Sequence, residues 1–360
     1  MRDYCLLKKI GEGSFGTVYK AKNSDQNIFA LKILIKNKHF KNFGYREIDI
    51  LIKLQSLRHP NIVKSLFLII IQLFKIKNSF SLYEVLDERY NHKQRIVLVL
   101  DYMDSDLSNY IKFAYPLSFE TIRIITVQIL EGVKCLHQND IIHRDIKSHN
   151  ILIRYNDLIV KITDFGLSKV VTTPNSILSR MIVTLEYRAP EIFLTPNYNE
   201  KVDIWSIGCI LIELINGKKL FKGRNELDIM KDIIKKIGYP EIENWPKSSS
   251  ISINTFSNIT CDGINSYINI REPDLMNLIP HILCFNPDKR MSCNAILSHS
   301  FLVQWSVRDY ITKLYKFHMI RHKHNLNFKE NWASSGFQNK QVTNDEHTQQ
   351  ENETHINVIN

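Results

Sequence analysis

The hydrophobic and polar positions of the first hundred residues predict mainly β-strands. Short apolar or alternating runs occupy residues 17–21, 28–34 and 95–100, and a glycine-rich turn at 11–16 precedes the first of them. Residues 45–57 have helical spacing instead. The apolar stripe of this predicted helix consists of Ile48, Leu51, Ile52 and Leu54. We therefore expect a small strand-rich unit that carries one main helix.

The pattern becomes helical from residue 117 onward. Apolar residues recur at helical spacing in five segments, at 119–138, 201–215, 226–237, 279–284 and 293–297. A strand-rich unit followed by a larger helical unit is typical of an α+β protein with a cleft between two lobes.

Composition agrees with this outline. The 360 residues are 44% hydrophobic and 23% charged, which is ordinary for a globular chain of about two lobes or domains. The net charge of +10 favours phosphate-bearing or acidic partners, but by itself gives no reason to expect a DNA ligand. Residues 304–324 form a basic extension, and residues 325–360, with few apolar positions, are expected to be a disordered tail.

The cysteines and the apolar segments indicate in which cellular compartment the protein is expected. The six cysteines are scattered without a Cys-x-x-Cys pair, which predicts reduced thiols in an intracellular protein of the cytoplasm or nucleus. The first residues contain no apolar stretch that would serve as a signal peptide. The apolar run at 66–74 is about half of the ~20 residues that a bilayer requires, so we expect no membrane span and no membrane partner.

A glycine-rich sequence near the N-terminus is the first candidate for chemistry. Gly11, Gly13, Gly16 and Val18 follow the pattern G-x-G-x-x-G-x-V, and Ser14 lies inside it. A strand follows rather than a helix, which disfavours a dinucleotide-binding fold. Glycines between two strands let backbone N–H groups approach phosphate oxygens, although many such hairpins are plain turns.

Further motifs follow in a fixed order. Lys32 lies in the next strand, and Glu47 lies on the first helix. Beyond them come four more segments: His143-Arg-Asp, Thr163-Asp-Phe-Gly, Ala189-Pro-Glu and the helical Asp203-Ile-Trp-Ser. Each of these motifs alone has a high false-positive rate. The probability that all of them occur in this order by chance is well under ~1%. Over residues 4–303 the chain resembles the eukaryotic protein kinase family.

The resemblance implies a bilobal fold with ATP in the cleft between the lobes. The N-lobe would cover about residues 4–100, the hinge 101–106 and the helical C-lobe 107–303. The reaction implied is transfer of a phosphoryl group from ATP, with Mg²⁺, to a hydroxyl of a protein substrate. Because the transition state of this reaction is loose, positioning and cations carry the catalysis.

The family's nucleotide-binding residues have counterparts in this chain. The resemblance implies that Lys32 holds the α- and β-phosphates and is itself held by Glu47. It implies that Asp164 and Asn150 are the ligands of Mg²⁺, a cation that prefers oxygen ligands.

The family's catalytic residues are also present. Asp145 would be the catalytic base, Lys147 would neutralise the γ-phosphate, and Thr184 would brace both of them. A lysine two residues after the catalytic aspartate is typical of serine/threonine kinases. The resemblance further implies a structural salt bridge between Glu191 and Arg290.

The resemblance places the adenine pocket around the hinge. Leu100 would guard the back of the pocket, and main-chain groups of Asp101 and Met103 would pair with adenine. Apolar side chains would enclose the ring. These side chains are Val18, Ala30 and Leu152, although plain core packing explains all three equally well.

Within the family, residues 183–191 resemble cyclin-dependent kinases and their relatives, the CMGC group. In that group the arginine equivalent to Arg188 shapes a pocket that prefers proline after the phosphorylated residue. Residues 223–240 resemble the same group. The resemblance therefore implies proline-directed phosphorylation of proteins and raises the question of a cyclin-like activator.

Several positions depart from the group. In the helix that would bind cyclin, where residues 41–47 are the equivalent segment, only Arg46-Glu47-Ile48 matches, which makes cyclin dependence doubtful. Glu186 replaces a tryptophan. Ser179 aligns with the activating threonine, and phosphate there would pair with Arg144; a loop serine that is never modified is an equally good interpretation.

Residues 65–81 interrupt the family pattern. They are rich in Ile, Leu, Phe, Lys and Asn and stand where related kinases run directly into a strand. One interpretation is an apolar insert that docks a partner. The other, which we favour slightly, is that these residues are the translation of an AT-rich intron that the mature transcript lacks.

Two rival functions stay open from the sequence. A pseudokinase scaffold would bind partners without catalysis, but the intact Lys32, Asp145, Asn150 and Asp164 argue against it. A basic nucleic-acid binder would use the cations between residues 308 and 323, although a solvated helical extension explains them more simply. The sequence does not indicate an oligomeric state.

Overall fold

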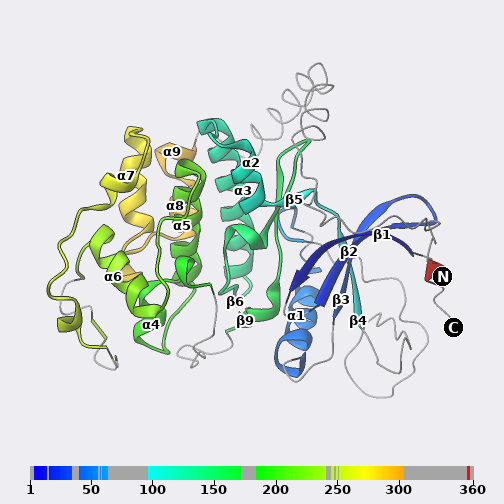
Figure 1. Ribbon diagram of the computed structural model, residues 1–360, viewed down its shortest axis with the longest axis horizontal. Coiled ribbons are helices and arrows are strands. Elements are labelled where there is room, and N and C mark those ends of the chain that lie inside the picture. The colour runs from blue at the N-terminus through cyan, green and yellow to red at the C-terminus, as the bar shows by residue number, and fades with distance from the viewer. Residues whose placement is uncertain are drawn as a thin grey trace, which may run out of the picture.

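The computed structural model of the chain has a strand-rich lobe and a larger helical lobe (Figure 1). This arrangement confirms the predicted α+β, bilobal architecture. The structure describes residues 4–13, 16–34, 40–55, 57, 59–63, 96–171, 184–240, 245–246, 249, 251–303 and 355–356.

One antiparallel sheet forms the small lobe. Its strands are β1 (Tyr4–Gly13), β2 (Gly16–Asn23), β3 (Ile28–Leu34) and β4 (Ile96–Asp101), which lie side by side in chain order. A short strand, β10 (His355–Ile356), pairs with the outer edge of β1. The predicted tail therefore contributes two residues to the sheet, and the rest of 304–360 lies outside the described residues, as does the insert at 65–81.

The predicted glycine turn joins β1 to β2. The two strands meet at Gly13 and Gly16, and Ser14, between them, lies outside the described residues. A Cβ atom on Gly16 would lie 2.1 Å from the carbonyl oxygen of Ile33 on β3. Only glycine lets β2 approach β3 this closely, which is a reason for this glycine beyond the turn itself.

Helix α1 (Phe40–Gln55) is the main helix of the small lobe and begins before the predicted start at residue 45. The predicted apolar stripe is correct for Ile48, Leu51 and Leu54, which are buried, whereas Ile52 is half-buried. Glu47 is buried on the same helix. Helix α1 therefore carries a carboxylate into the interior of the protein.

Helices dominate the large lobe. They are α2 (Leu107–Ala114), α3 (Phe119–His137), α4 (Pro190–Leu194), α5 (Lys201–Asn216), α6 (Glu226–Ile237), α7 (Pro273–Ile282), α8 (Cys293–Leu297) and α9 (Ser300–Val303). Ser118 caps α3, because its side chain accepts a hydrogen bond from the Thr121 amide. Helix α7 begins well before the predicted residue 279; Glu272 caps it and Pro273 opens it, two start signals that apolar spacing does not detect. None of the described helices has the length and apolar character needed to cross a membrane.

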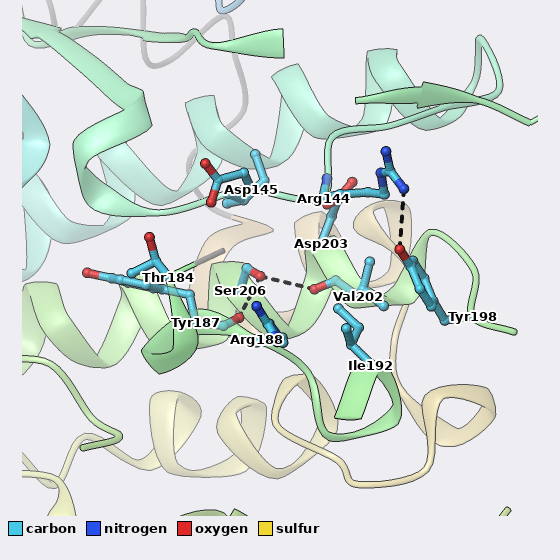
Figure 2. A pocket seen from close by; sticks show the side chains of 11 residues that line it. Arg144, Asp145, Thr184, Tyr187, Arg188, Ile192, Tyr198, Val202, Asp203 and Ser206 are labelled. Carbon is cyan, nitrogen blue, oxygen red and sulfur yellow. Dashed lines mark hydrogen bonds between the residues drawn. The ribbon is translucent and has the colours of Figure 1, made fainter. Parts of the chain in front are cut away.

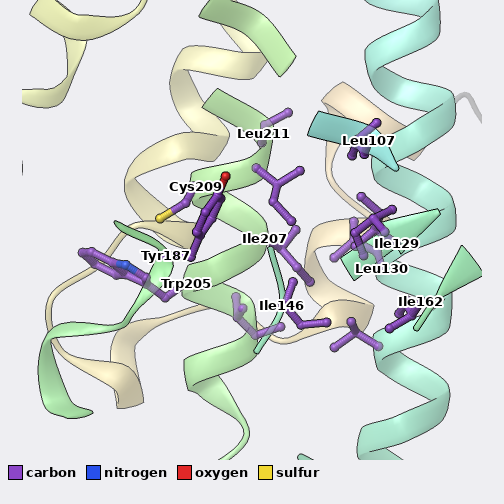
Figure 3. Packing of buried hydrophobic residues seen from close by; sticks show 14 of the residues in the cluster. Leu107, Ile129, Leu130, Ile146, Ile162, Tyr187, Trp205, Ile207, Cys209 and Leu211 are labelled. Carbon is purple, nitrogen blue, oxygen red and sulfur yellow. The ribbon is translucent and has the colours of Figure 1, made fainter. Parts of the chain in front are cut away.

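Helix α5 is the centre of the hydrophobic core. Every residue from Val202 to Asn216 is buried, which explains why its sequence is apolar almost all round. Side chains of α5 and α3 pack against each other, as Figure 3 shows for Ile207 and Leu130. Trp205 extends this core and stacks on Phe221, with ring centroids 5.6 Å apart. This core gives the large lobe a rigid base for the loops above it.

Short strands hold those loops. Strands β5 (Ser105–Asp106), β7 (Ile151–Arg154) and β8 (Ile159–Ile162) form one small sheet, and β6 (Ile141–Ile142) pairs with β9 (Lys169–Val170). The segment 143–150, which we call the catalytic loop, therefore runs between two anchored strands, β6 and β7.

Candidate active site

Lys32, Glu47 and Asp164 meet where the two lobes face each other. Lys32 Nζ lies 2.7 Å from Glu47 Oε1 and 3.7 Å from Asp164 Oδ1. Burial alone would lower the pKa of Lys32, but the negative charges of Glu47 and Asp164 raise it above its ordinary value. The lysine is therefore a fixed cation that joins β3, α1 and the segment after β8. The predicted contact between Lys32 and Glu47 is present.

The pairing of β7 with β8 brings Asn150 and Asp164 to the same end of that sheet. Asn150 directly precedes β7, Asp164 follows β8, and Ile151 is opposite Ile162 in the antiparallel register. The Thr163 amide donates to the Asn150 carbonyl at 3.0 Å. Two residues that are distant in sequence thus become neighbours through backbone pairing.

Asp164 fits a role as a cation ligand. Its φ of 67° is in the left-handed region, and its Oδ1 atom is buried and accepts no hydrogen bond from any residue that the structure describes. A buried carboxylate oxygen without a hydrogen-bond donor is stabilised by a nearby cation. Lys32 Nζ lies 3.7 Å from this oxygen, which is too far for a hydrogen bond, so the oxygen can still accept a further cation. Burial alone would raise the pKa of Asp164, but the charge of Lys32 lowers it, so the group is ionised. An Asp and an Asn side chain provide the oxygen ligands that Mg²⁺ prefers.

Asp145 is held by two donors of its own loop. Lys147 Nζ lies 2.8 Å and Asn150 Nδ2 2.8 Å from Asp145 Oδ2, and Lys147 Nζ also donates to Thr184 Oγ1 at 3.0 Å. Burial raises the pKa of Asp145, while the charge of Lys147 opposes this change. Both donors end on Oδ2, and no described group donates to Oδ1. Oδ1 can therefore accept a hydrogen bond from a bound group.

Asp203 of α5 fixes the backbone of the catalytic loop. Its carboxylate accepts the amides of His143 at 2.9 Å and Arg144 at 2.8 Å, and its Oδ2 lies 2.9 Å from His137 Nε2. Arg144 has a φ of 68°, a conformation that a non-glycine residue rarely adopts without such support. The sequence identified Asp203 as part of a motif but assigned it no role, because its partners are far away in the chain.

The predicted adenine-pocket residues lie on both sides of the hinge. Ala30 on β3 is opposite Leu100 on β4, and both are buried, as is Met103. The side chain of Asp101 binds Lys161 at 2.6 Å, which ties the end of β4 to β8 of the large lobe. The remaining predicted residues are Gly11 and Gly13 on β1, Val18 on β2 and Leu152 on β7.

Arg188 lies near Asp145. Both line one pocket together with Thr184 and Ile192, as Figure 2 shows. Arg188 is buried and donates to Glu226 Oε1 at 2.6 Å. Glu226 was not predicted as its partner, although it lies in the stretch 223–240 that resembles the same kinase group. The predicted phosphosite Ser179 lies outside the described residues.

The predicted salt bridge between Glu191 and Arg290 is confirmed. Arg290 Nη1 lies 2.8 Å from Glu191 Oε1, and the side chains are 0% and 7% exposed. Glu186, which the family resemblance marked as a departure, forms an ion pair with Lys219 at 2.8 Å. Burial alone would raise the pKa of Glu186, but the hydrogen bond from Lys219 lowers it. This ion pair explains how a carboxylate is accommodated at that position.

Comparison with known proteins agrees with this geometry. Residues 4–302 match the family described as protein kinase domain. The chain is 33% identical over 311 residues to cyclin-dependent kinase 4 of Mus musculus, an alignment that covers 83% of this chain and 96% of that protein. Its identity to cyclin-dependent kinase 4 of Xenopus laevis is 34% over 306 residues, which cover 83% of this chain and 90% of that protein. The chain therefore belongs to the protein kinase family, as a serine/threonine kinase that resembles the cyclin-dependent kinases.

Proposed function

We propose that this kinase uses ATP and Mg²⁺ to phosphorylate serine or threonine residues that precede a proline. The observation that carries the proposal is the position of Asp145. Its Oδ2 is fixed by Lys147 and Asn150, its Oδ1 is left for a substrate hydroxyl, and it shares a pocket with Arg188. One site thus supplies a base and a neighbouring surface for the acceptor peptide.

Each residue has a distinct part in the proposed reaction. Asp145 Oδ1 orients the acceptor hydroxyl and takes its proton, and Lys147 remains beside the transferred phosphate. Lys32 holds the α- and β-phosphates from the other lobe. Asp164 and Asn150 would hold Mg²⁺, which neutralises charge on the phosphate oxygens when bound. Because these groups are fixed before the substrate binds, little reorganisation is needed during transfer.

The proline preference rests on Arg188. A buried guanidinium with a carboxylate partner at 2.6 Å keeps one conformation, and its burial beside Thr184 and Ile192 gives the pocket a defined wall. Any other residue directly after the phosphorylated one would bury its backbone N–H without a partner wherever the protein offers no acceptor. Proline has no N–H, so it is favoured over other residues at that position.

Catalysis is favoured over the pseudokinase alternative. Lys32 is paired with Glu47, Asp164 Oδ1 is buried without a donor, and Asp145 is oriented by two residues of its loop. A scaffold that only binds partners has no need for this arrangement. We expect Asp164→Asn to abolish magnesium-dependent phosphorylation while the fold is kept; activity that persists in this variant would contradict the assigned role.

An activator and a compartment are also proposed. The relatives are named cyclin-dependent, so a cyclin-like protein is the first activator to test. The contact of Glu47 with Lys32 is made within the chain, and Lys53 of α1 donates to the Asn139 carbonyl at 2.8 Å, which supports activity without an added subunit. All six cysteines are free, which supports an intracellular site in the cytoplasm or nucleus.

The decisive experiment is a positional peptide library with the full-length chain, Mg²⁺ and ATP, with and without an added cyclin. We expect proline to be selected directly after the phosphorylated residue. Arg188→Ala should lose this selection, whereas the matched variant Glu226→Gln, which keeps the arginine, should retain most of it. An active wild-type enzyme that shows no preference for proline would refute the proposal.

A further inference from the structure

Three buried polar side chains meet beneath the active site. Tyr187 donates to Glu213 Oε2 at 2.7 Å, Ser148 donates to Glu213 Oε1 at 3.2 Å, and the two hydroxyl oxygens are 3.0 Å apart. Ser148, Tyr187 and Glu213 are 0%, 3% and 4% exposed. This cluster joins three elements: the catalytic loop, the segment 184–188 and helix α5.

Proton counting shows how tightly the cluster is closed. When Glu213 is ionised, the Tyr187 and Ser148 hydroxyls both donate their protons to its carboxylate. No proton then remains for the contact between the two hydroxyl oxygens. A protonated Glu213 supplies the third proton, and every contact is then a hydrogen bond. Burial raises the pKa of Glu213, against the opposing hydrogen bonds of Tyr187 and Ser148 and the charges of Lys219 and Lys112. A network of buried polar groups whose contacts are all hydrogen bonds is rigid.

The cluster acts on the same two segments that form the active site. Ser148 follows Lys147, which binds Asp145 and Thr184, and Tyr187 lies three residues after Thr184. The Tyr187 carbonyl also accepts from Ser206 of α5 at 2.8 Å, a bond drawn in Figure 2. The catalytic loop and the segment 184–188 are thus joined twice. Lys147 and Thr184, which are half-buried, make one connection, and the buried cluster makes the other.

We infer that Ser148 is a positioning residue for phosphoryl transfer. Its hydroxyl fixes the catalytic loop against the segment 184–188, and so sets the separation between Asp145 and the surface on which the acceptor peptide lies. Small displacements of a base from its substrate reduce the rate strongly, because the reacting atoms must be aligned within fractions of an ångström. Lys32 and Asp164, which would hold the nucleotide, lie outside this loop, and Asn150 is anchored separately because its carbonyl accepts the Thr163 amide at 3.0 Å. Binding of ATP should therefore not depend on the Ser148 hydroxyl.

The test is steady-state kinetics of Ser148→Ala in the full-length chain, with Mg²⁺, ATP and a serine peptide that the wild-type protein phosphorylates. We expect kcat to fall about tenfold, the worth of one buried hydrogen bond, with an unchanged KM for ATP. Tyr187→Phe keeps the ring and removes the hydroxyl. It should cause a similar fall, and the double variant should be little worse than either single one.

The matched control is Thr126→Val. Thr126 is also buried, but its hydroxyl donates only to the Ile122 carbonyl within α3, so its loss should leave kcat unchanged. If Ser148→Ala and Thr126→Val have the same kcat per folded molecule, the Ser148 hydroxyl is only structural and the inference is wrong. A KM for ATP that rises as much as kcat falls would also overturn it. Should Ser148→Ala fail to fold, Tyr187→Phe decides by the same criteria.

The inference rests on the proposed phosphoryl transfer but not on the preference for proline. A peptide library without proline selection would therefore refute the proposed function and leave this test intact. Equal kcat values for Ser148→Ala and the control would refute the inference and leave the proposed function intact.

Discussion

Removal of the Arg290 guanidinium should destabilise the large lobe more than any exposed ion pair could. Besides Glu191, its nitrogens donate to the carbonyls of Cys284 at 2.9 and 3.0 Å and of Lys201 at 2.7 Å, and the group lies over the Trp205 ring. In Arg290→Met, the Glu191 carboxylate and these carbonyls would stay buried without their donor. Breaking one side of such a pair costs about 3–5 kcal/mol. For a folding unit of this size, that corresponds to a fall in Tm of about 6–20 °C.

Thermal denaturation of matched variants measures this effect. Arg154→Met is the control, because Arg154 binds Asp157 at 2.6 Å but its side chain is 43% exposed. We expect that variant to lose at most about 1 kcal/mol. The double variant Arg290→Met, Glu191→Met should recover part of the loss, since no buried charge remains. If Arg290→Met and Arg154→Met melt at the same temperature, the buried pair does not stabilise the lobe and our reasoning is wrong.

Three further predictions concern the active site. Because burial raises the pKa of Asp145 and the reaction needs its carboxylate form, kcat should fall on acidification at a pH above the ordinary aspartate value of 3.8. Lys147→Ala should move this fall to higher pH, since the lysine charge lowers that pKa; a pH–rate profile with an unmoved limb would argue against Asp145 as the base. Glu47→Gln should reduce kcat/KM for ATP by about tenfold or more, because Lys32 loses its buried anion. The measurement is kinetics at varied ATP concentration, and a kcat/KM within about twofold of the wild-type value would contradict this prediction. Asp203→Asn should lower both kcat and Tm, because an asparagine has one acceptor oxygen and only one of the two loop amides would keep its hydrogen bond. Calorimetry and kinetics equal to wild type would show that Asp203 does not hold the catalytic loop.

Local patterns in the sequence predicted most of the secondary structure. Helix α5 and strand β3 have nearly the predicted bounds. Their apolar residues mark the buried positions, so the pattern of apolar residues shows where each element begins and ends. The start of α7 was missed, since a capping glutamate and a proline mark it rather than apolar spacing. The order of the motifs also identified the kinase family and so predicted which residues form the active site, and family resemblance paired Glu191 with Arg290 across 99 positions of sequence.

The amino-acid sequence by itself thus determined the identity of the chemical groups and the element on which each one lies. Only the tertiary structure decided which atoms meet: that Lys147 and Asn150 both donate to Asp145 Oδ2, that Arg188 binds Glu226, and that Ser148 closes a buried network with α5. The physical reason is that periodicity reports only whether a position faces water or protein. The partner of a buried polar group is set by the packing of elements far apart in the chain, and this packing leaves no periodic trace in the sequence.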